Sequence, residues 1–327
     1  MNVKISIDAM GGDFGPSVTM EAVIRVLSIH LDVSALVFGD LSVLQNCIDK
    51  NLNSSITSRL EICHCESTVD CHDKPSHAVR TKQDSSMALA LKSLKNGDSM
   101  ACVSAGNTGV LMALSLFTLG TLPSISRPAI CAEIPTSNGN KLMLDLGANV
   151  DCSVDQLYQF AILGSHTARI ALNITNPSLR LLNVGTEAGK GNNLVQSTAK
   201  MLEDDTSLNY QGFIEGDGIF QGISDVIVCD GFSGNVALKA GEGVARHIYH
   251  KLSALSSSSK DDFAELKASI QPSLFNGAYL LGINGVVVKS HGGADIHGFS
   301  NALERAINAA RHQLPAALSP LLETFNS

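Results

Sequence analysis

The sequence predicts an α/β fold in which a mostly parallel sheet carries helices on both faces. Short runs rich in β-branched residues recur along the chain, most of them end in glycine-rich loops, and helical patterns follow. Repetition of strand, loop and helix in this order is typical of a parallel sheet with helices packed on both sides. Because ligands of such sheets bind at the carboxyl ends of the strands, we expect function in those loops.

Eight segments combine a strand pattern with the loop that follows it. They are residues 3–16, 33–40, 59–65, 99–109, 141–152, 179–193, 224–235 and 284–295. Apolar residues recur with the period of a helix in segments 85–96, 154–172 and 194–205. We therefore predict a three-layer α/β/α arrangement within a single domain spanning residues 1–327.

The composition excludes several classes of protein. With 44% hydrophobic and 17% charged residues, the 327-residue chain can bury a sizeable core. Its formal net charge of −8 is not that of a nucleic-acid-binding protein, so we expect no nucleic-acid partner. The apolar run from Val110 to Leu122 is shorter than the ~18 residues of a membrane span, and the N-terminus has the pattern of a strand, not of a signal peptide. These features predict a cytoplasmic protein.

A serine run at residues 256–259 separates two helical patterns, each with one apolar stripe. We predict a helical hairpin inserted between two strands at about residues 242–275. It either packs on the core or a subunit interface, or it faces a membrane or a partner. The two stripes consist of Val244, Ile248, Leu252 and Leu255, and of Phe263, Leu266 and Ile270.

The eight cysteines are expected to be reduced, because thiols of cytosolic proteins stay reduced. Residues 63–72 gather Cys63, Cys65 and Cys71 with two histidines. This stretch lacks the C-x₂-C spacing of zinc sites, and alternation along a strand would place Cys63 and Cys65 on the same face. We interpret it as a strand with its loop and predict that it binds no metal.

The loop NVGTEAGKGNN is the most informative one. Gly185, Gly189 and Gly191 bend the chain, Lys190 supplies a fixed positive charge, and Asn192 follows. The backbone N–H groups of such loops can approach an anion closely. Gly191 stands where a Walker A loop requires a hydroxyl, and no G-x-G-x-x-G fingerprint of a dinucleotide site is present. An anion-binding loop and a tight structural turn both fit this pattern.

Other strand ends also carry polar side chains. A single Asn or Asp in a loop is usually a turn or cap residue, but a parallel sheet gathers several strand ends at one edge. No G-x-S-x-G elbow is present, which leaves Ser104 and Cys152 as nucleophile candidates. The polar residues are Ser104 and Asn107; Asp145, Asn149 and Asp151; Asp230, Ser233 and Asn235; and His291 and Asp295.

Seven motifs in order give the sequence a specific resemblance. They are MGGD, KPSHAVR followed by SSM, SAGNTG, LDLGANVDC, LLNVGTEAGKGN, DGFSGNVALK and LLGINGVVVKSHG, within about residues 3–310. Together they resemble the phosphate acyltransferase family of bacterial phospholipid synthesis. The resemblance implies a fold of the isocitrate and isopropylmalate dehydrogenase-like type, shared with phosphate acetyltransferases. It also implies a homodimer that contacts the inner face of the cytoplasmic membrane peripherally.

The activity implied by the resemblance is transfer of the acyl group from acyl-acyl-carrier-protein to inorganic phosphate, with no cofactor. The product would feed an integral-membrane glycerol-3-phosphate acyltransferase, which is the downstream partner. The chain departs from the family pattern after the histidine, where two serines are common and this chain has Gly292 and Gly293. Backbone N–H groups remain available there, but serine hydroxyls do not.

Acyl transfer to phosphate needs a site for the anion, donors for the thioester oxyanion and a proton for the leaving thiolate. Lys190 with the amides around it suits the first role, Asn107 or Asn235 the second, and His291 the third. Because phosphate is itself a nucleophile, we predict direct attack without an acyl-enzyme. We also assign phosphate or acyl binding to Gly185, Gly189, Gly191, Asn192, Ser104, Asn107 and Asp230.

The carrier protein is acidic as a class, whereas this chain is also net negative, so its binding requires a local basic patch. Arg246 and Lys251 in the first hairpin helix are the candidates. Two alternative functions stay open. One is an enzyme of the phosphotransacetylase type that uses acyl-CoA, or a dehydrogenase on the same scaffold. The other is a non-catalytic carrier-protein or lipid-binding module, which would bind without phosphate-dependent loss of the thioester.

Overall fold

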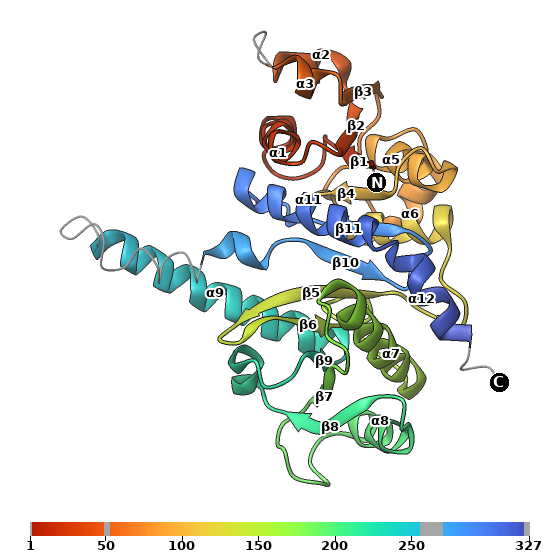
Figure 1. Cartoon of the computed structure of the whole chain (residues 1–327), viewed down its shortest axis with the longest axis vertical. Coiled ribbons are helices and arrows are strands. Elements are labelled where there is room, and N and C mark those ends of the chain that lie inside the picture. The colour runs from red at the N-terminus through yellow and green to blue at the C-terminus, as the bar shows by residue number, and fades with distance from the viewer. Residues whose placement is uncertain (1, 49–52, 256–270, 324–327) are drawn as a thin grey trace.

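The chain forms one eleven-stranded sheet covered by helices, as seen in a computed structural model that describes residues 2–48, 53–255 and 271–323 (Figure 1). The strand order is β3-β2-β1-β4-β11-β10-β5-β6-β9-β7-β8. Seven strand pairings are parallel and three are antiparallel. The predicted mostly parallel α/β fold is confirmed.

The elements follow one another in the order expected from alternating strands and helices. The strands are β1 (Val3–Asp8), β2 (Val33–Gly39), β3 (Leu60–His64), β4 (Ala101–Ser104), β5 (Ala129–Thr136), β6 (Gly139–Leu144), β7 (Ser178–Leu182), β8 (Asn209–Ile214), β9 (Val226–Val228), β10 (Ala278–Leu281) and β11 (Val286–Lys289). The helices are α1 (Pro16–Ile29), α2 (Leu41–Asn46), α3 (Ser54–Thr57), α4 (Pro75–Thr81), α5 (Ser86–Asn96), α6 (Thr108–Leu119), α7 (Val154–Ala171), α8 (Asn193–Asp204), α9 (Gly231–Leu255), α11 (Ile296–Arg311) and α12 (Leu314–Glu323), with two 3₁₀ helices, η1 (Gly216–Gln221) and η2 (Pro272–Phe275).

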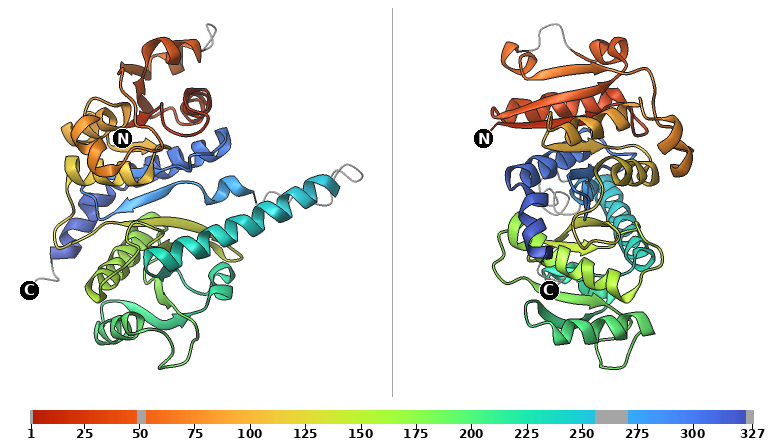
Figure 2. Two further views of the ribbon diagram at one scale, coloured as in Figure 1. Left: turned by 180° about the vertical axis from the view of Figure 1, so that it is seen from behind. Right: turned by 90° about the vertical axis from the view of Figure 1, so that its right-hand side faces the viewer.

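Helices cover both faces of the sheet (Figure 2), and two apolar cores, one on each face, hold the three layers together. Helices α1, α7, α8, α11 and α12 contribute to one core, and α4, α5, α6 and η1 contribute to the other. The alternation of side chains along β2 serves both, because Ala35 and Val37 belong to the first core while Leu36 and Phe38 belong to the second.

The two parallel parts of the sheet run in opposite directions. Strands β3, β2, β1, β4 and β11 are parallel to one another, as are β6, β9, β7 and β8. Three antiparallel pairings, β11 with β10, β10 with β5, and β5 with β6, separate the two parts and reverse the direction. The carboxyl ends of β1, β4 and β11 therefore form one edge of the sheet, the β4–β11 edge. Those of β6, β9 and β7 form the opposite edge, the β9–β7 edge.

All eight segments expected to contain strands do so, whereas β5, β8 and β10 are strands that the sequence pattern missed. Helix α9 begins at Gly231, well before residue 242, where the predicted hairpin starts. Its N-terminus is stabilised by Asp230, whose carboxylate accepts the Ser233 N–H at 2.8 Å and the Ser233 hydroxyl at 2.9 Å.

The far end of α9 extends beyond the body of the molecule (Figures 1 and 2). The second helix of the predicted hairpin, with Phe263, Leu266 and Ile270, lies outside the described residues. Among the helices that are described, none combines the length and the apolar character that a membrane crossing demands.

Candidate functional site

Glycine-containing loops at the β4–β11 edge pack backbone against backbone. The N–H of Asp13 donates to the carbonyl of Gly292 at 2.8 Å. A Cβ atom added to Gly11 would lie 2.5 Å from the Gly106 nitrogen, so no side chain fits between these two loops. The glycines of MGGD and SAGNTG are thus explained by the close approach of the strand ends that carry them.

The buried carboxylate of Asp8 supports these loops through hydrogen bonds. Asp8 at the end of β1 accepts hydrogen bonds from the hydroxyls of Ser86 at 2.6 Å and Ser104 at 2.7 Å. Burial raises the pKa of Asp8, and the hydrogen bonds from these two hydroxyls oppose the rise. Ser104 was predicted as a binding residue and a nucleophile candidate. Its side chain is fully buried, and its hydroxyl is already engaged with Asp8.

Asn107 joins two elements of this edge. Its Oδ1 accepts the N–H of Val110 at 3.1 Å and so caps α6, while its Nδ2 donates to the carbonyls of Cys71 at 2.8 Å and Asp73 at 3.3 Å. The amide is therefore engaged at both ends with the protein itself. A role for Asn107 as an oxyanion donor would require its Nδ2 to leave the loop between β3 and α4.

His291 follows β11 with its ring held in one orientation. Its backbone N–H donates to Asn276 Oδ1 at 2.6 Å, and its Nδ1 accepts the N–H of Gly293 at 3.0 Å. In the neutral ring the proton therefore sits on Nε2. Burial lowers the pKa of His291, as does the nearby Lys239, so the ring is neutral near pH 7 and has an Nε2–H to donate. The backbone N–H of Gly293, where the family commonly has a serine, therefore orients this histidine.

Lys289 is a candidate functional residue that the sequence analysis missed. It is the last residue of β11, and its Nζ donates to the carbonyl of Ala105 at 3.3 Å and to the carbonyl of Ser290. Within the described part of the chain, no ion pair includes Lys289. Burial lowers its pKa to about 8. A charged residue directly before the SHGG loop was the signal that could have identified it.

Two cavities open at this edge and share Asp13 in their walls. One, of about 680 Å³, is lined by Lys289, Asn107 and Gly292 among others. The other, of about 500 Å³, is lined by His291 and by Arg246 of α9. The second predicted carrier-protein residue, Lys251, is exposed further along α9. The structure thus brings His291, Asn107 and Arg246 to one region and adds Lys289 to them.

The remaining candidates lie at the opposite, β9–β7 edge. Asp230 is engaged in the N-terminal turn of α9, and Asn235 follows one turn later, exposed. A Cβ added to Gly147 would lie 3.6 Å from the Asn235 side chain, so Asn235 faces the loop after β6. In that loop Asp145 accepts backbone N–H groups, including that of Asn149 at 2.7 Å, and is fully buried.

The loop with Lys190 belongs to the same edge and lies between β7 and α8, away from β11 in all views (Figures 1 and 2). The side chain of Lys190 is exposed, and its carbonyl accepts the Asn183 side-chain amide at 3.0 Å. Gly191 has a φ of +97°, and a Cβ there would lie 2.2 Å from Asn183 Oδ1. Asn192 caps α8 through the N–H of Val195 at 2.9 Å. These contacts explain Gly191 and Asn192 structurally and leave the Lys190 ammonium facing solvent.

Gly185 and Gly189 complete this loop. The side chains of Glu187 and Lys190 both lie against Gly185, where an added Cβ would be 2.8 Å from Glu187 Oε2. Gly189 has a φ of +94°, a conformation that favours glycine, and space around it is open. The backbone geometry therefore accounts for the glycines whether or not an anion binds.

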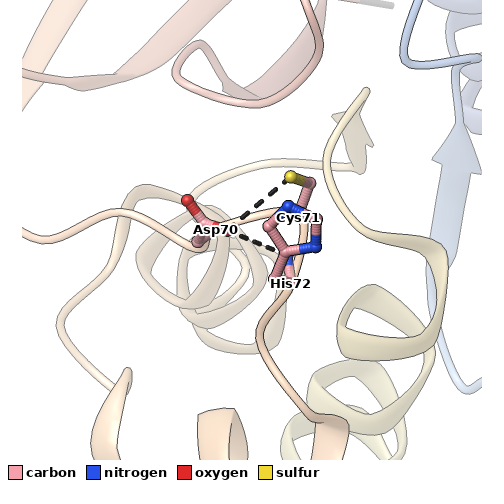
Figure 3. Close-up of side chains that lie close together, drawn as sticks. All are labelled: Asp70, Cys71 and His72. Carbon is pink, nitrogen blue, oxygen red and sulfur yellow. Dashed lines mark hydrogen bonds between the residues drawn. The ribbon is translucent and has the colours of Figure 1, made fainter.

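Asp70, Cys71 and His72 bring three ligand-type atoms within 4.8 Å of one another in the loop before α4 (Figure 3). They are adjacent in sequence and exposed, and Asp70 Oδ1 accepts the N–H of His72 at 2.8 Å. A turn closed by Asp70 is sufficient to explain their proximity. That this stretch binds no metal stays a prediction.

Cys152 was the second nucleophile candidate. Burial raises the pKa of Cys152 to about 11, which makes it a poor source of a thiolate nucleophile.

The fold is shared with solved phosphotransacetylases. That of Streptococcus pyogenes superposes with a TM-score of 0.66 at 16% identity, covering 95% of this chain and 94% of that chain. A branched-chain phosphotransacylase from Enterococcus faecalis V583 gives a TM-score of 0.60 at 15% identity, covering 95% and 99%. A 4-hydroxythreonine-4-phosphate dehydrogenase from Salmonella typhimurium gives 0.53 at 10% identity, covering 94% and 99%. The fold class is thus that of phosphotransacetylases and related dehydrogenases.

Sequence comparison narrows the class to one family. A family model described as "Fatty acid synthesis protein" matches residues 3–317. The phosphate acyltransferase of Nitrosococcus oceani is 46% identical, over 100% of this chain and 98% of the relative. That of Pseudomonas syringae pv. syringae is 45% identical, over 98% and 97%. The chain belongs to the phosphate acyltransferase family and is an acyltransferase.

Proposed function

We propose that this protein transfers the fatty acyl group of acyl-acyl-carrier-protein to inorganic phosphate, forming acyl phosphate for bacterial phospholipid synthesis. The observation that carries the proposal is the combination of Lys289 and His291 in neighbouring cavities at the carboxyl ends of β4 and β11. A partly buried ammonium and a neutral imidazole suit the two charges that develop when a thioester is cleaved. Membership of the phosphate acyltransferase family supports the choice of phosphate as acceptor.

The reaction needs no acyl-enzyme. A phosphate oxygen attacks the thioester carbonyl carbon, and the Nε2–H of His291 donates to the carbonyl oxygen as it becomes negative. The carbon–sulfur bond then breaks with its electron pair on sulfur, and the Lys289 ammonium gives the thiolate a proton. The products are acyl phosphate and the free carrier-protein thiol, and Lys289 regains a proton from solvent.

In the wall of the His291 cavity, acidic side chains outnumber the arginine, so the phosphate needs further positive charge there. Asp13, Glu242 and Asp295 line the cavity of His291, against the single arginine Arg246. We infer that the enzyme acts as a homodimer in which the Lys190 loop of a second copy supplies the missing cation. Asp230 and Asn235 belong to the same edge as Lys190 and would approach with it.

The carrier protein would dock beside the same cavity. Arg246 lies in its wall and Lys251 is exposed one turn beyond, so both are accessible to an acidic partner along α9. The acyl phosphate would pass to an integral-membrane glycerol-3-phosphate acyltransferase. We propose that the tip of the predicted hairpin holds the enzyme at the inner face of the cytoplasmic membrane, because the far end of α9 extends away from the sheet.

Acyl phosphate formation from acyl-acyl-carrier-protein, measured with and without inorganic phosphate, tests the proposed function. We expect thioester loss and acyl phosphate to appear together and only when phosphate is present. Binding of the carrier protein without thioester loss would contradict the proposal and favour a binding module. The phosphotransacetylase-like fold favours acyl-CoA as the second candidate donor. Equal turnover with acyl-CoA in the absence of carrier protein would identify that activity instead.

A further inference from the structure

The side chain of Asn276, directly after η2, ties three elements together at the cavity of His291. Asn276 is buried and belongs to the wall of that cavity. Its Oδ1 accepts the N–H of His291 at 2.6 Å. Its Nδ2 donates to the hydroxyl of Ser290 at 2.9 Å and to the carbonyl of Gly298, in the first turn of α11, at 2.6 Å. Both ends of the amide are therefore engaged, which fixes its orientation.

The backbone that carries Asn276 is itself held by elements distant in sequence. Arg305 of α11 donates from Nε to the Asn276 carbonyl at 3.0 Å and from Nη2 to the Leu274 carbonyl at 3.2 Å. Its guanidinium also forms an ion pair with Glu133 of β5 at 2.9 Å. Gly277 follows with a φ of +94°, and a Cβ added there would lie 2.7 Å from Arg305 Cδ. The end of η2 is thus packed against α11, which gives Asn276 a fixed position.

The loop that Asn276 contacts contains His291 followed by Gly292 and Gly293. Glycine restricts the backbone least, so the orientation of the histidine depends on its hydrogen bonds. Its N–H donates to Asn276, and its carbonyl accepts the N–H of Ala294 at 3.1 Å. The ring is held separately, because Nδ1 accepts the N–H of Gly293 at 3.0 Å. Loss of the bond to Asn276 would release the backbone at His291 and change the direction of Nε2.

We propose that Asn276 is a positioning residue for acyl transfer, which holds His291 with its Nε2–H directed at the thioester carbonyl oxygen. The inference rests on the proposed function, because it presupposes that His291 donates to this oxygen. Misplacing a group by about 1 Å in an active site costs on the order of 10²-fold in rate, and removing an oxyanion donor costs about 10²- to 10³-fold. Loss of Asn276 keeps the donor but not its direction, so we expect an effect of about 10- to 100-fold.

A double-mutant cycle with His291 tests whether Asn276 acts through the histidine. Asn276→Ala should lower kcat by about 10- to 100-fold and leave KM for acyl-carrier-protein within about twofold, because the donor acts mainly in the transition state. In the His291→Ala background the same change should lower kcat by less than about twofold, since the group to be positioned is already absent. An equal loss in both backgrounds would overturn the inference.

Two further variants separate positioning from stability. Asn301 of α11 donates from Nδ2 to the carbonyl of Ser273 at 2.9 Å, so Asn301→Ala also loosens η2 but leaves the bond to His291 intact. It should lower the melting temperature and keep kcat. Asn276→Asp keeps an acceptor for the His291 N–H but has no N–H for Ser290.

Asn276→Asp should bring kcat back to within about threefold of wild type, although its melting temperature should be no higher than that of Asn276→Ala. The positioning role predicts this recovery, whereas a purely structural role predicts none. The Asp variant therefore decides the question even where Asn276→Ala does not fold. An Asn276→Asp enzyme slowed tenfold or more, or an Asn301→Ala enzyme as slow as Asn276→Ala, would refute the positioning role.

Nitrogen-15 NMR of histidine-labelled protein observes the ring of His291 without turnover, and the signal missing from His291→Ala assigns it. At pH 8 the wild type should show one tautomer, with the proton on Nε2, and Asn276→Ala should show a mixture. An unchanged ring signal in Asn276→Ala would contradict the inference whatever the activity. A wild type with one tautomer that makes no acyl phosphate would refute the proposed function and leave the positioning of His291 intact.

Discussion

At the end of β11, Lys289 holds an ammonium group where water stabilises its charge poorly. Burial lowers its pKa to about 8; Asp8 of β1 and Asp13 of the following loop act in the opposite direction, and Lys239 of α9 reinforces the decrease. An acid is most effective when its pKa is close to the pKa of the group that it protonates and to the pH of the medium. An ordinary thiol has a pKa of about 8.5, so Lys289 is well matched to a leaving thiolate.

Lys289→Met should lower the turnover number by about 10²- to 10⁴-fold, because it removes the proposed proton donor. The wild-type rate should fall as pH rises above about 8, since Lys289 then loses the proton that it must donate. The residual rate of Lys289→Met should show no such fall. Initial rates of acyl phosphate formation between pH 6 and pH 10 measure both effects.

Lys95→Met is the matched control, because Lys95 is exposed on α5 and should leave the rate and its pH profile unchanged. A wild-type rate that stays level through pH 9 would argue against proton donation by Lys289. So would a Lys289→Met enzyme with nearly normal turnover and an unchanged melting curve.

Single residues also show where sequence reasoning ends. The sequence places Ser104 at a strand end, but its hydrogen-bond partner Asp8 is 96 residues away, and only the sheet topology joins them. A serine whose hydroxyl is free and one that supports a buried carboxylate look identical in the sequence. Lys289 was missed for a related reason, because its burial depends on loops from β1 and β4 and not on its neighbours in sequence.

Among the elements, the start of α6 depends on Asn107. Asn107→Ala should lower the free energy of unfolding by about 0.5–2 kcal/mol, because the N-cap acceptor for Val110 is lost. It should also release the loop that Nδ2 holds through the carbonyls of Cys71 and Asp73. Urea denaturation measures the first effect, and the rate of thiol labelling at Cys71, the one exposed cysteine, measures the second.

Asn107→Asp separates the two roles of this side chain. The carboxylate keeps an acceptor for the N-terminus of α6 but has no N–H for the loop carbonyls. We expect its stability to be closer to wild type than that of Asn107→Ala, with labelling of Cys71 still accelerated. Normal stability and normal labelling in both variants would show that Asn107 does not tie the two elements together.

The tip of the predicted hairpin, at about residues 242–275, is the part that we propose contacts the membrane. Replacing Leu255, Phe263 and Leu266 with Glu should abolish co-flotation with anionic liposomes, because weak peripheral binding depends on a few apolar and basic contacts. Soluble turnover should stay near that of wild type, since the proposed chemistry lies at the strand ends. Unchanged liposome binding would place the membrane contact elsewhere, and loss of the dimer would identify the tip as an interface.

The strands that the sequence pattern revealed are mainly those of the two parallel parts. Buried residues run almost without a break through β1, β4 and β11, as expected for strands covered on both faces. The pattern missed β5 and β10, which run antiparallel between the two parts. Strand β5 contains Glu133, which forms an ion pair at 2.9 Å with Arg305 of α11, a residue distant in sequence.

For the whole molecule, the reversal of strand direction decides which candidate residues one chain can combine. The sequence predicts that all the strand-end residues gather at one edge of the sheet. His291 and Asn107 do lie at one edge, but Lys190 lies at the other, because β7 runs opposite to β11. Lys190→Ala should nevertheless lower the rate about 10²- to 10³-fold, since it removes a preorganised group for the phosphate. Rate measurements at saturating carrier protein, with a melting curve as control, test this.

Mixing two inactive variants tests whether the β4–β11 edge of one subunit meets the β9–β7 edge of another. Lys190→Ala and His291→Ala, refolded together, should regain activity, because some mixed dimers combine the intact Lys190 loop of one copy with the intact His291 of the other. Neither variant refolded alone should do so. A mixture as inactive as its parents, with mixed dimers demonstrated by differential tagging, would exclude a site shared between copies.

The same topology governs the order in which the protein can be completed during its synthesis. Lys289 meets the carbonyl of Ala105, yet the two are 184 residues apart in the chain. A ribosome adds about 5–20 residues per second, so β4 leaves it on the order of 10–40 s before its neighbour β11 exists. During that time β4 is an apolar edge strand with unpaired backbone groups, the kind of surface that promotes aggregation. The nascent chain therefore has a period in which chaperones, not native contacts, must protect its N-terminal half.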